Sequence, residues 1–142
     1  GEDAFYGCSG LTSVTIPSSV TSIRGGAFQG CLVQSKYIIN DSNFDLTNYG
    51  LSIYDDIIDN LCVKGNTVIG YKGNPTSVTI PSNVTSIGES AFSGCSSLTS
   101  ITIPSSVTSI GGAAFEKCNS LTSVTIPNSV TSIGSSAFGF CM

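Results

Sequence analysis

The chain has 142 residues, of which 40% are hydrophobic and only 10% are charged, and its net charge is −4. The charged share is far below the roughly 25% of ordinary soluble proteins, and the absence of a basic run excludes electrostatic capture of nucleic acid or an anionic membrane surface. A transmembrane helix needs roughly 20 consecutive apolar residues, whereas the apolar runs here are much shorter, so the sequence predicts no membrane insertion.

The N-terminus resembles the middle of a repeat. The stretch GEDAFYGC matches GESAFSGC at 88–95, which makes residues 1–10 the tail of a preceding unit. No signal peptide is present at this terminus. We therefore expect the chain to be a segment cut from a longer array.

A 23-residue period runs through the rest of the chain, interrupted once. Ile-Pro pairs recur at 16–17, 80–81, 103–104 and 126–127, and Ala-Phe pairs recur at 4–5, 27–28, 91–92, 114–115 and 137–138. The predicted regular coils are 11–33, 75–97, 98–120 and 121–142, and an irregular block occupies 34–74. Such a period indicates one solenoid, in which stacked coils share a core that no single coil could bury.

Each coil has the same internal pattern, here taken from the last one. Val124 and Ile126 alternate with polar residues, which predicts a short strand with one buried face. Pro127 ends that strand because it lacks an N–H group, and VTSI forms a second extended piece. Gly134 then predicts a tight turn with positive φ. One helical or 3₁₀ turn at 135–141 completes the coil.

Phenylalanine recurs at one position of every coil. Stacking of the coils therefore predicts a buried aromatic spine, formed by Phe5, Phe28, Phe92, Phe115 and Phe138.

The unit LTSVTIPSSVTSIGxxAFxxC resembles the BspA-like (treponemal-type) leucine-rich repeats over residues 1–31 and 75–142. The segment DNLCVKGNTVIGYKGNPTSVTIP is similar to the strand–turn–strand insertion of that family. Arg24, in place of the glycine of other coils, and Pro75, in place of the leading leucine, depart from the pattern. The resemblance implies a right-handed leucine-rich-repeat solenoid with little helix and short parallel strands on its concave face. It also implies adhesion or protein recognition at a cell surface or after secretion.

Five of the six cysteines share one position of the coil, namely Cys8, Cys31, Cys95, Cys118 and Cys141. This spacing favours an inward ladder of buried thiols over disulfides, because parallel Cβ vectors give poor disulfide geometry. Cys62 lies outside the register, and we expect it in a buried strand of the irregular block.

The sequence offers little for catalysis or for a cofactor. It contains no histidine, so no Ser-His-Asp or Cys-His arrangement can form. Asp55, Asp56 and Asp59 in YDDIID are solvated loop acids or a turn cap more simply than a catalytic pair. DSNFD resembles the start of a calcium loop but lacks its later glycine and glutamate. We expect no enzyme activity, no cofactor and no metal.

Two surfaces could contact a partner. The first is the outer face of the TSVTI strands, where a Ser-x-Thr pair repeats at Ser13/Thr15, Ser77/Thr79, Ser100/Thr102 and Ser123/Thr125, with Thr131 as a further uncommitted hydroxyl. The alternative is that small hydroxyl residues merely keep an exposed strand soluble. The second surface is the irregular block, through Tyr37, Phe44, Tyr49, Tyr54, Asp55, Asp56 and Tyr71. Its alternative is that the rings cover a distorted coil.

We accordingly predict a non-enzymatic interaction or adhesion module whose partner is a protein, a matrix or host ligand, or a glycan. The runner-up is a structural stalk, and a lesser alternative is an ice- or polysaccharide-binding solenoid. Terminal coils without polar caps also predict end-to-end self-association.

Overall fold

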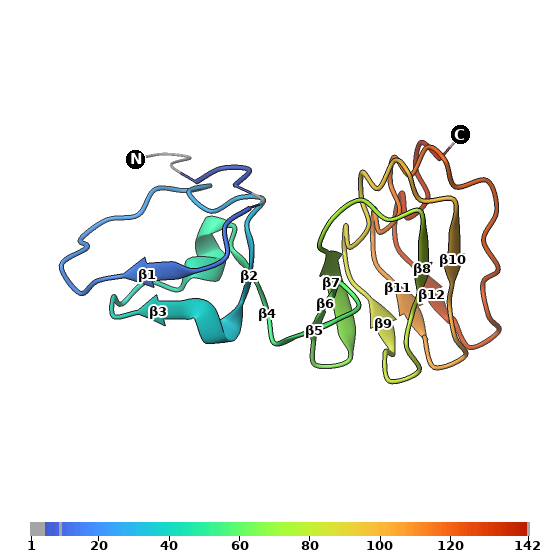
Figure 1. The fold of residues 1–142 in the computed structure, drawn as a ribbon, viewed down its shortest axis with the longest axis horizontal. Coiled ribbons are helices and arrows are strands. Elements are labelled where there is room, and N and C mark those ends of the chain that lie inside the picture. Colours follow the sequence, from blue (N-terminus) through green and yellow to red (C-terminus); the bar gives the residue numbers. More distant parts are fainter. Residues whose placement is uncertain (1–4, 9, 142) are drawn as a thin grey trace. The chain divides into compact units, whose positions relative to one another are not determined.

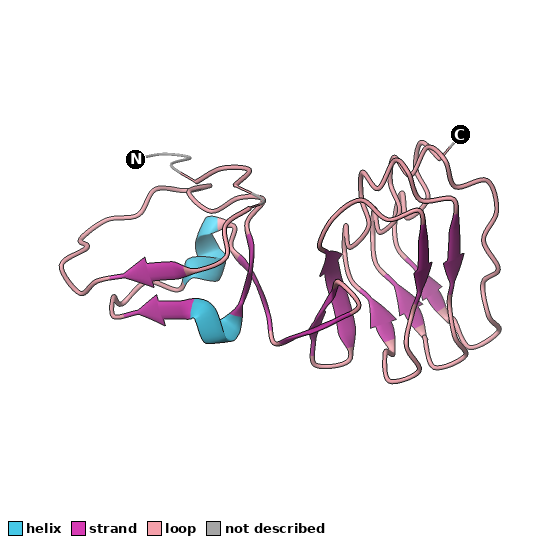
Figure 2. Cartoon of the chain, in the orientation of Figure 1, coloured by secondary structure: helices cyan, strands magenta, loops and turns pink. Residues whose placement is uncertain are grey.

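The computed structural model describes residues 5–8 and 10–141, and the chain divides into two compact units at 56/57, inside the irregular block. Residues 1–4 and 9 of the predicted partial coil 1–10, and Met142 at the end of the last coil, lie outside the described residues. Figures 1 and 2 show both units as coils of short strands joined by turns. No helix of the described part is long and apolar enough to cross a membrane.

Unit 1 carries two small parallel sheets and two 3₁₀ helices. β1 (Val14–Ile16) pairs with β3 (Ile38–Asn40), and β2 (Leu32–Gln34) pairs with β4 (Ser52–Tyr54). The helices η1 (Ser35–Tyr37) and η2 (Leu46–Tyr49) precede β3 and β4. The first part of the irregular block is therefore a distorted coil that stacks on coil 11–33. Its core contains Val14, Ala27, Phe28, Cys31, Val33, Leu46 and Leu51.

Unit 2 begins with the insertion predicted from the family resemblance. β6 (Leu61–Lys64) and β7 (Thr67–Tyr71) form an antiparallel hairpin with a bulge at Cys62/Val63. β5 (Asp56–Ile58) lies beside β6, and β7 pairs in parallel with β9 (Ser86–Ile87). The hairpin thus takes the place of a coil, and the regular coils stack on it. Cys62 is buried in this hairpin, as predicted.

The regular coils of unit 2 continue two parallel ladders. The VTSI segments supply β9, β11 (Ser109–Ile110) and β12 (Ser132–Ile133), and the TSVTI segments supply β8 (Ser77–Thr79) and β10 (Ser100–Thr102). Ser109 pairs with both Ser86 and Ser132, so the 23-residue period is the physical register of the solenoid. In the last coil the predicted TSVTI strand is absent, because residues 122–126 make no backbone hydrogen bond to β10.

The aromatic spine is present in each unit by itself. Phe28, Phe92 and Phe115 are buried as predicted, and Phe138 is partly buried. Phe5 is 44% exposed, so its predicted burial is wrong. Its ring stacks on Phe28 at 5.3 Å between centroids, and its other face lacks a described neighbour.

The role predicted for Gly134 is also wrong. Among the described residues, the positive φ angles of these coils belong to positions further along, such as Ala113 (φ 54°) and Ser136 (φ 55°), and not to Gly134. Glycine is needed at this corner because adjacent coils approach closely. A Cβ on Gly134 would lie 2.3 Å from Gly112 N, and one on Gly111 would lie 2.6 Å from Glu89 N.

Candidate functional site

The Ser-x-Thr pairs lie on the solvent-facing side of the TSVTI strands. In β8 and β10 the middle residues Val78 and Ile101 are buried while the flanking serines and threonines are exposed. The pairing is in register, with Ser77 opposite Ser100 and Thr79 opposite Thr102. Parallel neighbours at about 4.8 Å therefore place these hydroxyls in a ladder, as the sequence predicts.

Other hydroxyls of the coils have a different role, which is to link one coil to the next. Thr99 Oγ1 donates to Thr76 O at 2.9 Å, and Thr108 Oγ1 donates to Thr85 O at 3.2 Å. Thr131 Oγ1 donates to Thr108 O at 3.2 Å, so the expectation that Thr131 is uncommitted is wrong.

The Ser-x-Thr hydroxyls, by contrast, have no hydrogen-bond partner within the part of the chain that the structure describes. This set comprises Ser13, Thr15, Ser77, Thr79, Ser100, Thr102, Ser123 and Thr125, and all eight residues are exposed. Composition alone could not separate them from the linking hydroxyls, because both sets are serine and threonine. The coil uses one set for its own cohesion and leaves the other to solvent.

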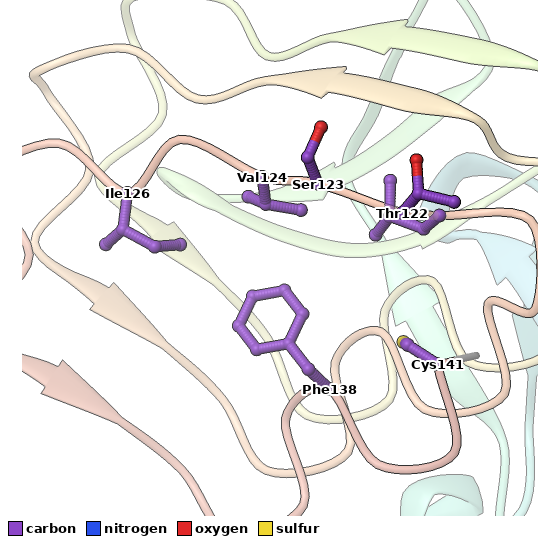
Figure 3. Close-up of a pocket in the computed structure, with 7 residues that line it drawn as sticks. Thr122, Ser123, Val124, Ile126, Phe138 and Cys141 are labelled. Carbon is purple, nitrogen blue, oxygen red and sulfur yellow. The ribbon is translucent and has the colours of Figure 1, made fainter.

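The last coil presents its pair differently. Ser123 and Thr125 lie on a segment that is not part of a sheet, and a pocket of about 360 Å³ lies against it. Leu121, Val124, Ile126, Phe138 and Cys141 supply the apolar part of the lining. In Figure 3 the ring of Phe138 faces the side chains of Val124 and Ile126 across this space. The coil end is thus an open apolar surface.

The structure separates the aromatic residues of the irregular block. Tyr71 belongs to unit 2, where it is half-buried and packs against Phe92 at 6.3 Å between centroids. Tyr54 is only 6% exposed and is part of β4. These two rings serve the packing of their units in this structure.

Three aromatic residues of unit 1 remain at or near its surface. Phe44 and Tyr49 are half-buried and pack edge to face at 6.0 Å between centroids. Tyr37 is 51% exposed, and Lys36 Nζ lies over its ring at 5.2 Å from the centroid. Tyr37 is therefore the most accessible of the five predicted block aromatics.

The acidic residues of the block make local contacts. Asp45 accepts from the backbone N–H of Thr47 at 3.0 Å and from its hydroxyl at 2.6 Å, which caps η2. Asp55 and Asp56 are exposed, and Gln34 Nε2 donates to the backbone oxygen of Asp55 at 3.2 Å. Within the described residues, no group of three or more His, Cys, Asp or Glu is placed to hold a metal ion.

The cysteines are thiols, with no disulfide among the described residues. Cys31, Cys95 and Cys118 are buried as predicted, Cys141 is half-buried, and Cys8 is exposed, so the inward ladder is wrong at Cys8. The thiol of Cys118 donates to Phe92 O at 3.2 Å. Burial, followed by the neighbouring thiols Cys95 and Cys141, raises the pKa of Cys118 to about 11, and burial also raises the pKa of Cys95. Such thiols are poor nucleophiles near neutral pH.

One exposed residue of the block was missed by sequence reasoning. Ile39 is 56% exposed although it lies in a strand, next to the inward-facing Ile38. The available signal was the Tyr-x-Ile spacing of Tyr37 and Ile39, which has the same period as Ser-x-Thr. Without the pairing register, that spacing could not be aligned with the regular coils.

Comparison with known proteins places the repeat. The family described as BspA type Leucine rich repeat region matches in six copies, over residues 1–72 and 65–142. No functionally curated protein matches the chain.

Two crystal structures of leucine-rich repeat proteins are similar to parts or all of the chain. One, from T. pallidum, is 25% identical over 53% of this chain, with a TM-score of 0.37. The other, from Bacteroides ovatus, is 21% identical over the whole chain, with a TM-score of 0.35. The chain spans 59% and 56% of the lengths of these two proteins.

Proposed function

The chain belongs to the family of BspA-type leucine-rich repeat regions, and from this premise we propose that it is a protein-interaction module of a surface-exposed or secreted protein. Proteins of this family and fold are generally non-enzymatic. The proposed role is adhesion: outward strand residues contact a partner, and the coils hold those residues in register. The partner class we favour is a protein.

The observation that supports the proposal is the division of labour among the hydroxyls. Thr108 and Thr131 are used to join coils, whereas Thr79 and Thr102 on neighbouring strands are exposed and without a hydrogen-bond partner in the described part. A rigid row of polar groups needs no rearrangement on binding, which lowers the entropic cost of association. Solenoids commonly bind partners through such extended strand surfaces.

The proposal can be tested with immobilised extracellular-matrix proteins and a glycan array as probes. We expect a matrix protein to bind the chain, and Thr79→Lys with Thr102→Lys to weaken that binding. Ser105→Lys is the matched control, since Ser105 is exposed on the same coil as Thr102 but lies in the turn after Pro104. Replacing 34–74 by a consensus coil is unsuitable, because Leu46 and Leu61 in that block are core residues of the two units.

The outcomes separate the candidate functions. Retention of glycans alone, with the same dependence on Thr79 and Thr102, would favour the polysaccharide-binding alternative. Absence of binding to every probe would favour a stalk, for which the outward hydroxyls only maintain solubility.

A further inference from the structure

The distorted coil of unit 1 replaces the Ser-x-Thr pair with two apolar residues. β1 and β3 pair in parallel with Val14 opposite Ile38 and Thr15 opposite Ile39. The same register places Tyr37 beside Ser13. Tyr37 and Ile39 thus occupy, on the neighbouring strand, the outward positions of Ser13 and Thr15. They are 51% and 56% exposed.

β3 is also an edge strand of its sheet, which contains only β1 and β3 among the described residues. Asp41 N donates to Ile16 O at 2.8 Å, so Ile39 and Asp41 direct their backbone groups toward β1. Successive residues of a strand alternate in this respect, so Ile38 and Asn40 direct theirs to the opposite edge. Figure 2 shows β3 leading out of the short helix η1.

The backbone groups at this edge are largely unpaired. The N–H of Ile38 donates to Ser35 O at the end of η1. The C=O of Ile38 and both backbone groups of Asn40 have no hydrogen-bond partner in the described part of the chain outside the β1–β3 ladder. A row of unpaired strand groups is a template for another extended chain.

We propose that the open edge of β3 binds an extended peptide segment of a partner protein by strand addition, an inference that rests on the interaction role proposed above. The peptide's backbone pairs with Ile38 and Asn40, and an outward apolar side chain packs beside Tyr37 and Ile39. Lys36 Nζ, which lies over the Tyr37 ring, attracts a peptide carboxylate at that end. The segment is therefore extended, with an apolar residue close to an acidic one.

Strand addition favours a peptide over a glycan. A sugar could stack on Tyr37, but it would leave the row of backbone groups at Ile38 and Asn40 unpaired. An extended peptide satisfies both the backbone groups and the two side chains, because its own side chains alternate with the same period.

The test begins with a displayed library of short random peptides, selected on the immobilised chain. Affinities of the selected peptides are then measured for the wild type and for Tyr37→Ser with Ile39→Thr, which restores the pair found in the regular coils. Both side chains are exposed, so a thermal melt should show an unchanged fold. We expect this variant to lose about tenfold or more in affinity. Tyr6→Ser is the matched control, because Tyr6 is an exposed tyrosine of unit 1 outside β3.

Two further measurements report on the backbone. N-methylation of the selected peptide should abolish binding at one set of alternate residues and not at the other. Hydrogen exchange at the amide of Asn40 should slow when the peptide is bound, whereas the amide of Ile39, already directed toward β1, should change little.

The results distinguish this inference from the proposed function. Selected peptides that bind the wild type and the double variant equally would overturn strand addition at β3 and leave the interaction role standing. Glycans that bind through Tyr37 when no peptide is selected would overturn the peptide as occupant. Absence of binding to peptides, matrix proteins and glycans alike would overturn both.

Discussion

The rings of Phe92 and Phe115 lie face to face, with centroids 5.2 Å apart and planes inclined by 2°. The backbone follows the same register, since Phe92 N donates to Ala114 O at 2.8 Å and Phe115 N donates to Ala137 O at 2.7 Å. Stacked rings and stacked coils are thus one feature, in which each coil buries the ring of its neighbour.

Phe115→Ala should destabilise unit 2 by about 3–5 kcal/mol, because the ring is fully buried between Phe92 and Phe138. Denaturant unfolding measures the loss. Phe5→Ala is the control and should cost much less, since that ring is 44% exposed. Equal losses for the two variants would show that the ring stack does not carry the core of unit 2.

Gly111→Ala should destabilise the chain by more than about 1 kcal/mol, since the new Cβ would lie 2.6 Å from Glu89 N and 2.7 Å from Gly88 C. Gly25→Ala provides the comparison, because a Cβ there meets nothing within 4 Å and the residue is outside the left-handed region. Thermal melts of the two variants should differ clearly. A harmless Gly111→Ala would mean that the coils are less closely spaced at this corner.

Lys117→Gly should stabilise the chain, by up to about 1 kcal/mol. Lys117 has φ 61°, a left-handed conformation that the corresponding coils fill with Gly30 (φ 83°) and Gly94 (φ 78°). Lys117→Ala removes the same charge without relieving the backbone. A gain in unfolding free energy shared by both variants would trace the effect to charge.

Stability should fall as pH rises from about 9 to about 11, through the thiol of Cys118. Its pKa rises from 9.0 in the reference state to about 11 in the folded chain, chiefly because of burial. The folded state therefore holds a proton that the unfolded state releases, and the resulting stability is complete below pH 9 and lost as pH passes the folded pKa. The difference between wild type and Cys118→Ala isolates this contribution from the tyrosines and lysines that titrate nearby. A difference that stays constant over this interval would contradict it.

We also propose that the chain self-associates through its last coil. Val124 and Ile126 line an open pocket with Phe138, and residues 122–126 lack the backbone pairing of β8 and β10. Light scattering should show a mass that rises with concentration, and Val124→Lys should reduce the rise. Ser105→Lys serves as the charge control. A wild-type mass that is independent of concentration would count against the proposal.

Much of the fold could be predicted from the sequence, because a solenoid repeats its requirements every coil. The buried residues Val78 and Phe92, the exposed pair Ser100/Thr102 and the hairpin around Cys62 all follow from period and pattern. In each case a local rule, alternation along a strand or recurrence at 23 residues, decides which way the side chain points.

The candidate site depended on information that the pattern lacks. Thr102 and Thr131 are the same amino acid in similar local sequences, yet one faces solvent and the other donates to the next coil. Gly134 is required by the approach of a neighbouring backbone and not by its own φ. Ile39 became part of a candidate surface only when the pairing of β1 with β3 placed it beside Thr15.

The sequence by itself therefore determined the coil, its core and its repeat, since these depend on the order of side chains within one unit. Only the tertiary structure decided which hydroxyls, glycines and apolar residues of the coil are committed to a neighbour. That decision depends on the register and spacing between coils, which are properties of residues far apart in the chain.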